Sequence, residues 1–230
     1  MIDIYIDCAN LEQMREAVKN PIVKGFTTNP TLMATGGVKD YEAFAKDALQ
    51  IVDGLPISFE VFADELDEME KQARKIASWG SNVNVKIPVT NTKGESSENL
   101  IVKLTNDEIK CNVTAIFGVD QAIDALLGIN TPGCIISIFA GRMADTGIDP
   151  SDDIKIIVGA ALWSETKVLW ASSREVLNIY QADMCCCDII TVTPDLLAKY
   201  ESFRGKDFTE FSLDTVKMFY EDAQKSGFTL

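Results

Sequence analysis

Short apolar segments alternate with amphipathic segments along the whole chain. Alternating apolar residues, many of them β-branched, predict eight strands, which cover Ile2–Asp7, Gly25–Asn29, Ile57–Phe62, Asn82–Ile87, Ile109–Thr114, Cys134–Phe139, Lys167–Ser172 and Asp188–Val192. Between the strands, apolar residues recur at i, i+3 and i+4, which predicts helices. The clearest of these cover Leu11–Lys19, Tyr41–Val52, Glu65–Ser78, Glu98–Asn106, Val119–Leu127, Ile154–Leu162 and Arg174–Ala182.

Helix-start signals support this division. Asn10, Asp40 and Asp64 are expected N-caps, and Pro194 is suited to open a short helix after the eighth strand. Eight strand–helix units follow one another over 230 residues without a Ser-, Gly- or Pro-rich linker. The pattern predicts the α/β class and a single (β/α)8 barrel (TIM barrel) domain over residues 1–230. The alternative is a doubly wound open sheet, but the glycine fingerprint that often follows its first strand is absent.

One more helix is expected beyond the eight units. After a loop over Glu201–Leu213, the spacing predicts a helix over Asp214–Ser226 with a short tail, so that residues 214–230 form a C-terminal extension. This segment carries Val216, Met218 and Phe219, more apolar surface than a free surface helix needs. Two arrangements are open: the helix packs on its own barrel, or it packs on a neighbouring subunit.

The charge balance limits the partners. Twenty-one Lys and Arg stand against 35 Asp and Glu, a formal net charge of −14. This argues against a protein that binds nucleic acid or anionic membranes, but it leaves room for small phosphorylated molecules held by a few cations. No apolar run approaches the ~20 residues of a membrane span, and the N-terminus lacks the pattern of a signal peptide. We expect a cytoplasmic protein.

Histidine is absent from the sequence. Its absence excludes Ser-His-Asp and Cys-His catalysis and the usual zinc sites, so any catalysis must rely on Lys, Asp, Glu, Tyr, Ser, Thr or Cys. The cysteines show no CxxC spacing, and in a cytosolic protein they are expected to be reduced. Adjacent residues cannot easily all face one ion, so we interpret Cys185–Cys187 as buried or bystander thiols.

Strand side chains alternate between the helices and the barrel interior. In the predicted strands the apolar residues share one face, and the other face carries polar residues near the C-terminal ends: Asp7, Glu60, Lys86, Asn112, Thr114 and Ser137. A barrel interior is normally filled with branched apolar side chains, and barrel enzymes place catalysis at the C-terminal ends of the strands. The alternation therefore predicts an active site there.

Lys86 is the unusual member of this set. It could be a bystander that extends out of the barrel mouth, but it lies in the apolar strand context Asn84–Pro88, where a buried ammonium is costly unless it is paired or loses its proton. An unprotonated lysine attacks carbonyl groups to give a Schiff base. Asp7 and Glu60 could then move protons in place of histidine. The alternative, carboxylates that hold a divalent metal, is disfavoured by a lysine among them.

These residues resemble the transaldolase family. The resemblance rests on Asp7, Thr27–Thr31, Lys86–Thr90, Asn112–Thr114, Phe139–Arg142 and Ala171–Arg174, one motif after another in order along the chain. The chain is similar in length to the compact bacterial branch, which also contains the fructose-6-phosphate aldolases. The resemblance implies aldol chemistry through a lysine imine, with no metal and no organic cofactor, on phosphorylated sugar substrates.

The resemblance also implies a role for each matched position. Lys86 matches the Schiff-base lysine, Asp7 the acid/base at the sugar C4 hydroxyl, and Glu60 with Thr114 the pair that orders a catalytic water. The implied substrate-binding residues are Asn29, Thr28, Asn112, Ser137 and Phe139, with a phosphate site formed by Arg142, Ser172 and Arg174. A solvated surface charge is the alternative for the two arginines. Ser173 departs from the pattern, because many relatives carry an aromatic residue there.

Two discriminating positions favour one activity within the family. A transaldolase transfers a dihydroxyacetone unit from a ketose phosphate, such as sedoheptulose 7-phosphate, to glyceraldehyde 3-phosphate, whereas the aldolases release free dihydroxyacetone. In the family, Glu60 and Phe139 go with transaldolases, and glutamine and tyrosine at these positions go with aldolases. A catalytically idle barrel used for binding remains a distant alternative. The resemblance also implies a homo-oligomer, a pentamer or decamer, with the C-terminal helix at the interface.

Overall fold

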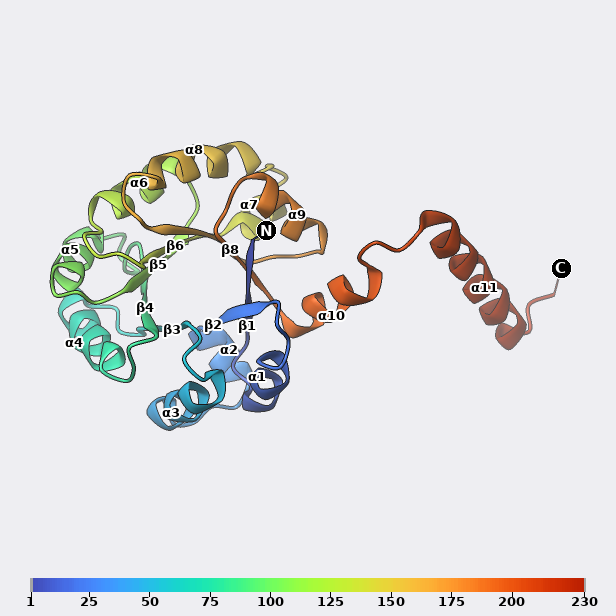
Figure 1. Ribbon diagram of the computed structural model, residues 1–230, viewed down its shortest axis with the longest axis horizontal. Helices are drawn as coiled ribbons and strands as arrows, with labels where there is room; N and C mark the ends of the chain where they lie inside the picture. The colour runs from blue at the N-terminus through green and yellow to red at the C-terminus, as the bar shows by residue number, and fades with distance from the viewer. Residues whose placement is uncertain (1, 230) are drawn as a thin grey trace.

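The computed structural model describes residues 2–229 as a closed barrel of eight parallel strands (Figure 1). The strands pair in sequence order, and the last pairs with the first, with Asp3 opposite Ile189. The predicted (β/α)8 barrel is confirmed. The strands are β1 Asp3–Asp7, β2 Val23–Thr27, β3 Ile57–Glu60, β4 Val83–Pro88, β5 Cys111–Ile116, β6 Ile135–Ile138, β7 Lys167–Trp170 and β8 Ile189–Val192.

Helices surround the barrel and three of them, α3, α5 and α6, have the bounds that the periodicity predicts. Two short helices that were not predicted, α2 and α7, follow β2 and β6 directly and lie beside the barrel mouth. The helices are α1 Leu11–Ala17, α2 Pro30–Thr35, α3 Tyr41–Val52, α4 Leu66–Ala77, α5 Glu98–Asn106, α6 Val119–Leu127, α7 Ala140–Asp145, α8 Ser151–Ala161, α9 Leu177–Met184, α10 Pro194–Phe203 and α11 Phe208–Ser226.

Three expected helix starts, those of α4, α8 and α9, are wrong, and α8 begins at Ser151 rather than at Ile154. Asp64 does not cap α4: its carboxylate instead accepts hydrogen bonds from the backbone N–H and hydroxyl of Thr92, and Glu65 occupies the cap position. Helix α9 begins at Leu177 rather than at Arg174, because Asn178 Oδ1 accepts hydrogen bonds from the backbone N–H groups of Arg174 and Glu175. Arg174 therefore lies in the loop between β7 and α9.

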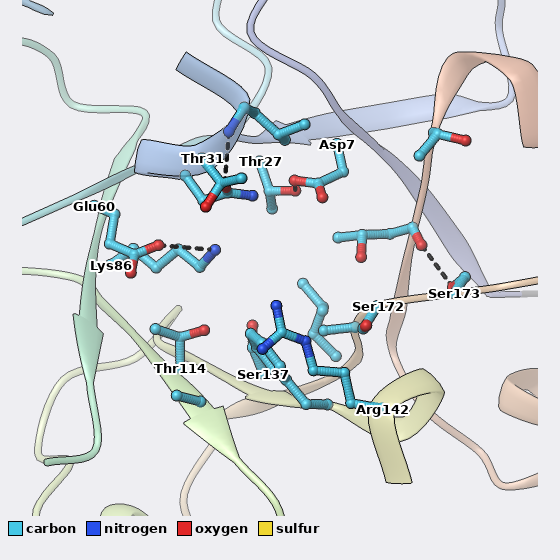
Figure 2. Close-up of a pocket in the computed structure, with 18 of the residues that line it drawn as sticks. Asp7, Thr27, Thr31, Glu60, Lys86, Thr114, Ser137, Arg142, Ser172 and Ser173 are labelled. Carbon is cyan, nitrogen blue, oxygen red and sulfur yellow. Dashed lines mark hydrogen bonds and ion pairs between the residues drawn. The ribbon is translucent and has the colours of Figure 1, made fainter. Parts of the chain in front are cut away.

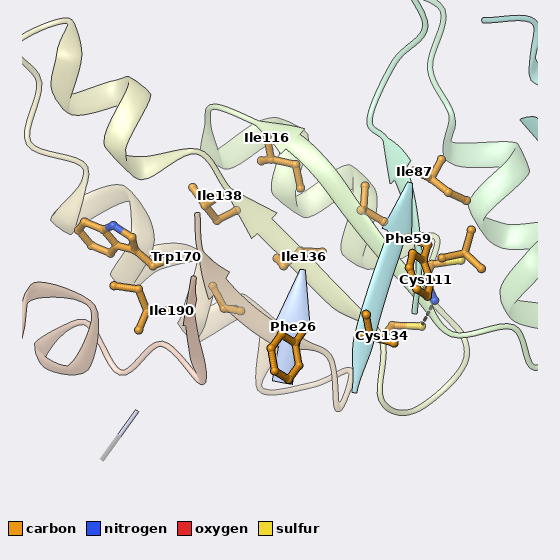
Figure 3. Packing of buried hydrophobic residues seen from close by; sticks show 14 of the residues in the cluster. Phe26, Phe59, Ile87, Cys111, Ile116, Cys134, Ile136, Ile138, Trp170 and Ile190 are labelled. Atoms are coloured by element: carbon orange, nitrogen blue, oxygen red, sulfur yellow. Dashed lines mark hydrogen bonds between the residues drawn. The ribbon is translucent and has the colours of Figure 1, made fainter. Parts of the chain in front are cut away.

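The apolar core has two parts, one outside and one inside the barrel wall. Between strands and helices lies the larger part, in which Phe26, Phe59 and Trp170 are fully buried (Figure 3). Inside the barrel, Tyr5 packs with residues of β6, β7 and β8. Gly25 on β2 makes room for Tyr5, since a Cβ at that position would lie 2.5 Å from the tyrosine ring. This inner cluster supports the polar residues nearer the barrel mouth.

The C-terminal helix starts earlier than expected. Helix α11 begins at Phe208, not at Asp214, and the predicted loop over Glu201–Leu213 contains the end of α10 and the start of α11. The Asp207 carboxylate caps the new start by accepting hydrogen bonds from the backbone N–H groups of Thr209 and Glu210. No residue of α11 is buried, and the helix projects away from the barrel (Figure 1).

None of the helices in residues 2–229 is long and apolar enough to cross a membrane.

Candidate active site

A cavity of about 450 Å³ opens at the C-terminal ends of the strands (Figure 2). Ten of the twelve predicted site residues line it: Asp7, Asn29, Glu60, Lys86, Thr114, Ser137, Phe139, Arg142, Ser172 and Arg174. The other two, Thr28 and Asn112, are fully buried in the wall and are not part of the lining. The fold thus brings together residues that are more than 160 positions apart in the sequence.

Lys86 and Glu60 form a buried ion pair in this cavity. They lie at the same level of the barrel, because β3 and β4 pair in a register that sets Glu60 opposite Lys86. Lys86 Nζ is 3.2 Å from Glu60 Oε2, and the Lys86 side chain is 8% exposed. The same Nζ donates a hydrogen bond of 3.2 Å to the backbone carbonyl of Thr28. Lys86 is therefore held inside the barrel and does not extend into solvent.

Asp7, at the end of β1, is the second carboxylate in the cavity. Its Oδ1 accepts a hydrogen bond of 2.7 Å from the hydroxyl of Thr27, the residue opposite it on β2. Burial raises the pKa of Asp7, and this effect outweighs the opposing effects of the Lys86 charge and the Thr27 hydrogen bond. A carboxyl group with a raised pKa exchanges protons closer to neutral pH, as a general acid/base requires.

Thr114 is an unpaired hydroxyl beside this pair. Its Oγ1 is buried and has no hydrogen-bond partner within residues 2–229. The next residue, Ala115, has a left-handed backbone (φ 61°), and the pairing of β5 with β6 shifts register there. A buried hydroxyl without a partner is a place where an ordered water or a substrate oxygen can bind.

A hydrogen-bond chain continues beneath the cavity. The Ser137 hydroxyl donates to Asn112 Oδ1 (2.7 Å), and Asn112 Nδ2 donates to the Ser58 hydroxyl (3.0 Å). Asn112 thus orients Ser137, which lines the cavity, while its own amide is fully buried and is not part of the lining. Thr28 has a similar place, since its hydroxyl donates to the Ser58 carbonyl and its own carbonyl accepts from Lys86.

Asn29 lies at the start of α2, where the chain leaves the barrel. Its Oδ1 caps the helix by accepting a hydrogen bond of 2.9 Å from the backbone N–H of Leu32. With the oxygen engaged, the Nδ2 group is the donor that Asn29 can offer to a ligand in the cavity. Pro30 at the first position of α2 has no N–H to satisfy, which favours a helix start here.

The cationic end of the cavity is built from α7 and the loop after β7. Arg142 extends into the cavity from α7 (Figure 2), and its guanidinium lies 5.2 Å from the centre of the Phe139 ring. Ser172 has a left-handed backbone (φ 67°). Gly141 allows the two segments to meet: a Cβ there would lie 1.7 Å from the Ser172 carbonyl oxygen. Two arginines and a hydroxyl are suited to a phosphate group.

Several further hydroxyl residues line the cavity that the sequence reasoning did not assign: Thr27, Thr31, Ser173, Thr191 and Thr193. Two of them could have been found, because the alternation applied to the second and eighth strands places Thr27 and Thr191 on the interior face. The Ser173 hydroxyl donates a hydrogen bond of 2.7 Å to the Thr191 carbonyl. Nothing in a strand pattern predicts Ser173, which lies in a loop.

In the part of the chain that the structure describes, no group of three Cys, Asp, Glu or His residues lies close enough to hold a metal ion. All six cysteines are free, and five of them are buried.

The fold and the cavity together define a barrel protein with a lysine–carboxylate site at the C-terminal ends of its strands. A family model described as Transaldolase/Fructose-6-phosphate aldolase matches residues 4–230. The chain is 38% identical over 191 residues to a "Probable transaldolase" of Dehalococcoides mccartyi, covering 82% of this chain and 85% of that protein. It is 36% identical over 222 residues to a "Probable transaldolase" of Streptococcus equi subsp. zooepidemicus, covering 95% and 96%. The chain belongs to the transaldolase/fructose-6-phosphate aldolase family of enzymes.

Solved structures of other barrels share the fold alone. A dihydrodipicolinate synthase from Rhodopseudomonas palustris superposes with a TM-score of 0.62 at 10% identity, covering 97% of this chain and 80% of that one. A structure titled "Native KDPGal structure" superposes with a TM-score of 0.57 at 14% identity, covering 96% and 95%.

Proposed function

We propose that the protein is a transaldolase that transfers a dihydroxyacetone unit from a ketose phosphate, such as sedoheptulose 7-phosphate, to glyceraldehyde 3-phosphate. The observation that carries this proposal is the buried Lys86–Glu60 pair, which shares one cavity with Asp7 and the two arginines. Lys86 is the nucleophile, Asp7 and Glu60 are the proton carriers, and Arg142 and Arg174 bind the phosphate.

The first step forms an imine on Lys86. Glu60 takes a proton from the Lys86 ammonium, and the freed Nζ lone pair attacks the C2 carbonyl of the ketose. Two protons pass in all from the nitrogen to the C2 oxygen, which leaves as water. Glu60, 3.2 Å from Nζ, is placed to accept the proton that the amine loses. Thr114 supplies a hydroxyl with no protein partner in the described structure, and with Glu60 it can hold the water that leaves here and returns at hydrolysis.

The second step breaks the C3–C4 bond. Asp7 takes the proton of the C4 hydroxyl, C4 becomes an aldehyde, and the bonding electrons move to C3 to give an enamine on Lys86. The raised pKa of Asp7 favours this proton transfer. The aldose phosphate departs, and three carbons stay bound to the lysine.

In the third step C3 of the enamine attacks the carbonyl carbon of the acceptor aldehyde. Asp7 returns its proton to the new alkoxide, and water releases the ketose product from Lys86. The atoms balance without an oxidant or a reductant, so no redox cofactor is required.

The second candidate, a fructose-6-phosphate aldolase, differs in the fate of the enamine, which is protonated at C3 and released as dihydroxyacetone. Phe139 lines the cavity but has no hydroxyl to deliver a proton. Together with Glu60, which the family resemblance associates with transaldolases, this favours transfer over release.

We further propose that the active form is a cytoplasmic homo-oligomer of five or ten chains. Helix α11 supports this proposal, because its apolar side chains are exposed and none of its residues is buried against the barrel. Six free cysteines suit a reducing compartment. Helix α11 projects away from the barrel (Figure 1), which favours the oligomer over the alternative of a C-terminal helix packed on its own barrel.

Borohydride trapping tests the nucleophile. We expect incubation with fructose 6-phosphate and borohydride to add one reduced adduct per chain, and peptide mapping to place it on Lys86. Lys86→Ala should give no adduct and no turnover. Lys103→Ala is the matched control, since Lys103 also pairs with a glutamate, Glu70 (2.7 Å), but on the surface. An adduct on any other lysine contradicts the proposal.

A second assay separates the two activities. It compares the rate of transfer to glyceraldehyde 3-phosphate with the rate of release of free dihydroxyacetone.

A further inference from the structure

The Arg174 guanidinium is held by one carboxylate at the edge of the cavity. Its Nη2 donates to Asp145 Oδ2 (2.6 Å), and its Nε lies 3.2 Å from both Asp145 oxygens. Within residues 2–229, this is the one side chain that the guanidinium hydrogen-bonds. Asp145 is not among the residues that line the cavity, so it acts on a ligand there through Arg174.

Without this ion pair little would hold the Arg174 side chain in one place. Arg174 lies in the loop before α9, and its side chain is 47% exposed. A half-exposed arginine samples many rotamers, and fixing one of them costs conformational entropy. A carboxylate that engages Nε and one N–H of Nη2 leaves three N–H groups of the guanidinium for a second anion. The pair therefore orients Arg174 without using up its donors.

The Asp145 carboxylate is carried by α7, which is packed tightly against the loop after β7. Arg142 and Asp145 are three residues apart on α7, so they lie on adjacent parts of its surface. The helix is packed directly against the loop that carries Arg174, because Gly141 meets the Ser172 carbonyl and donates a backbone hydrogen bond to Ala171. One helix thus presents one arginine to the cavity and orients the other.

Asp145 has two opposing effects on anion binding at this end of the cavity: it lowers the net positive charge, and it orients Arg174. Arg142 and Arg174 contribute two positive charges and Asp145 one negative charge. Both arginines lower the pKa of Asp145, the Arg174 hydrogen bond most strongly, so the carboxylate stays ionised at neutral pH. Removal of Asp145 would raise the net charge, which by itself favours an anion, but it would also free the Arg174 side chain. The two effects have opposite signs and can be separated by experiment.

We propose that Asp145 is a positioning residue that holds Arg174 in the orientation that binds the phosphate of the substrate. The inference rests on the proposed function for the identity of the substrate, but phosphate binding can be measured without turnover. Loss of one immobilised arginine rotamer should weaken phosphate binding roughly 3- to 10-fold. The orientation effect is expected to exceed the gain from the removed negative charge.

The experiment compares five forms (wild type, Asp145→Ala, Asp145→Asn, Arg174→Ala and the Asp145→Ala/Arg174→Ala double variant) in calorimetric titrations with inorganic phosphate and in steady-state kinetics with a ketose phosphate. Asp145→Ala should raise both the Kd for phosphate and the KM for the ketose phosphate roughly 3- to 10-fold. It should leave kcat within about 2-fold of the wild-type value. Asp145→Asn, which keeps a hydrogen-bond acceptor, should lie between wild type and Asp145→Ala. In the Arg174→Ala background, Asp145→Ala should change the Kd by less than about 2-fold, since Asp145 acts only through Arg174.

Asp107→Ala is the matched control. Asp107 pairs with Arg74 at 2.7 Å, with half-exposed side chains similar to those of the Asp145 pair, on the outer surface between α4 and the end of α5. The Asp107→Ala substitution should leave both the Kd for phosphate and the KM for the ketose phosphate unchanged.

The Kd values for phosphate test the role of Asp145, and turnover of ketose phosphates tests the proposed function. An Asp145→Ala protein that binds phosphate as well as or better than wild type overturns the positioning role, whatever the turnover shows. Additive effects of the two substitutions overturn it as well. A wild-type protein that binds phosphate but does not turn over ketose phosphates contradicts the proposed function and leaves the positioning role supported if the Kd values follow the expected order. Absence of phosphate binding by the wild type overturns both.

Discussion

At the scale of single residues, burial decides what the polar groups of the cavity can do. Asp7 is paired with a hydroxyl rather than with an arginine, so desolvation dominates and its pKa rises. Glu60 and Asp145 have cationic partners instead. Three carboxylates near one cavity thus have three different environments.

The raised pKa of Asp7 predicts a pH-dependent cost in stability. A carboxyl whose pKa is higher in the folded state than its ordinary value of 3.8 binds protons more tightly when folded. The folded state is favoured below that ordinary value, and the advantage is lost as the pH rises through the folded-state pKa. Asp7→Asn keeps the acceptor for Thr27 and carries no charge, so it should raise Tm relative to wild type at pH 7 and by less at pH 4, while abolishing turnover.

Thermal unfolding at the two pH values checks this, with Asp47→Asn, an exposed position on α3, as the control. An Asp7→Asn protein that is less stable than wild type at pH 7 would show that the Lys86 charge, rather than desolvation, dominates at Asp7.

At the scale of elements, the unexpected short helices α2 and α7 build much of the site. They bring Asn29 and Arg142 to the mouth directly after β2 and β6, where a simple strand–helix unit would have only a loop. Helix α7 depends on Gly141, which lets it approach the loop after β7 more closely than any other residue would allow.

Gly141→Ala should therefore be destabilising and should impair phosphate binding. The new Cβ would lie 1.7 Å from the Ser172 carbonyl oxygen, so the helix or the loop must move. Such overpacking costs about 1–3 kcal/mol, and denaturant unfolding measures it. Gly159→Ala in α8 is the control: a Cβ there meets nothing within 4 Å, and the change should stabilise by about 0.5–1 kcal/mol. Equal effects of the two substitutions would contradict the tight α7 packing.

At the scale of the whole molecule, α11 is the feature that a lone barrel does not explain. Its exposed apolar residues are Phe208, Phe211, Leu213, Val216, Met218, Phe219 and Tyr220. The first turns of α11 contact the preceding segment, where the Phe211 ring lies 5.3 Å from that of Phe203 and Lys206 pairs with Asp214. Exposed apolar surface of this extent is typical of an interface.

Truncation after Asp207 should reduce the molar mass measured by light scattering from that of an oligomer towards that of one chain. The barrel should remain folded, because α11 contributes no buried residue to it; far-UV circular dichroism and a cooperative unfolding transition check this. A full-length protein that is monomeric at micromolar concentration would contradict the oligomer proposal and leave the catalytic assignments untouched.

The barrel and the interior face of its strands can be predicted from local sequence patterns. Alternation within a strand is a local property, so Asp7, Glu60, Lys86 and Thr114 could be placed together without knowledge of any long-range contact. Which polar residues reach the cavity, and which pairs form across it, follows from long-range packing. The Asn112 amide is hydrogen-bonded to both Ser137 and Ser58. Arg174 pairs with Asp145, 29 positions earlier, because Gly141 lets their segments meet. Such contacts depend on how closely separate elements pack, which no local pattern records.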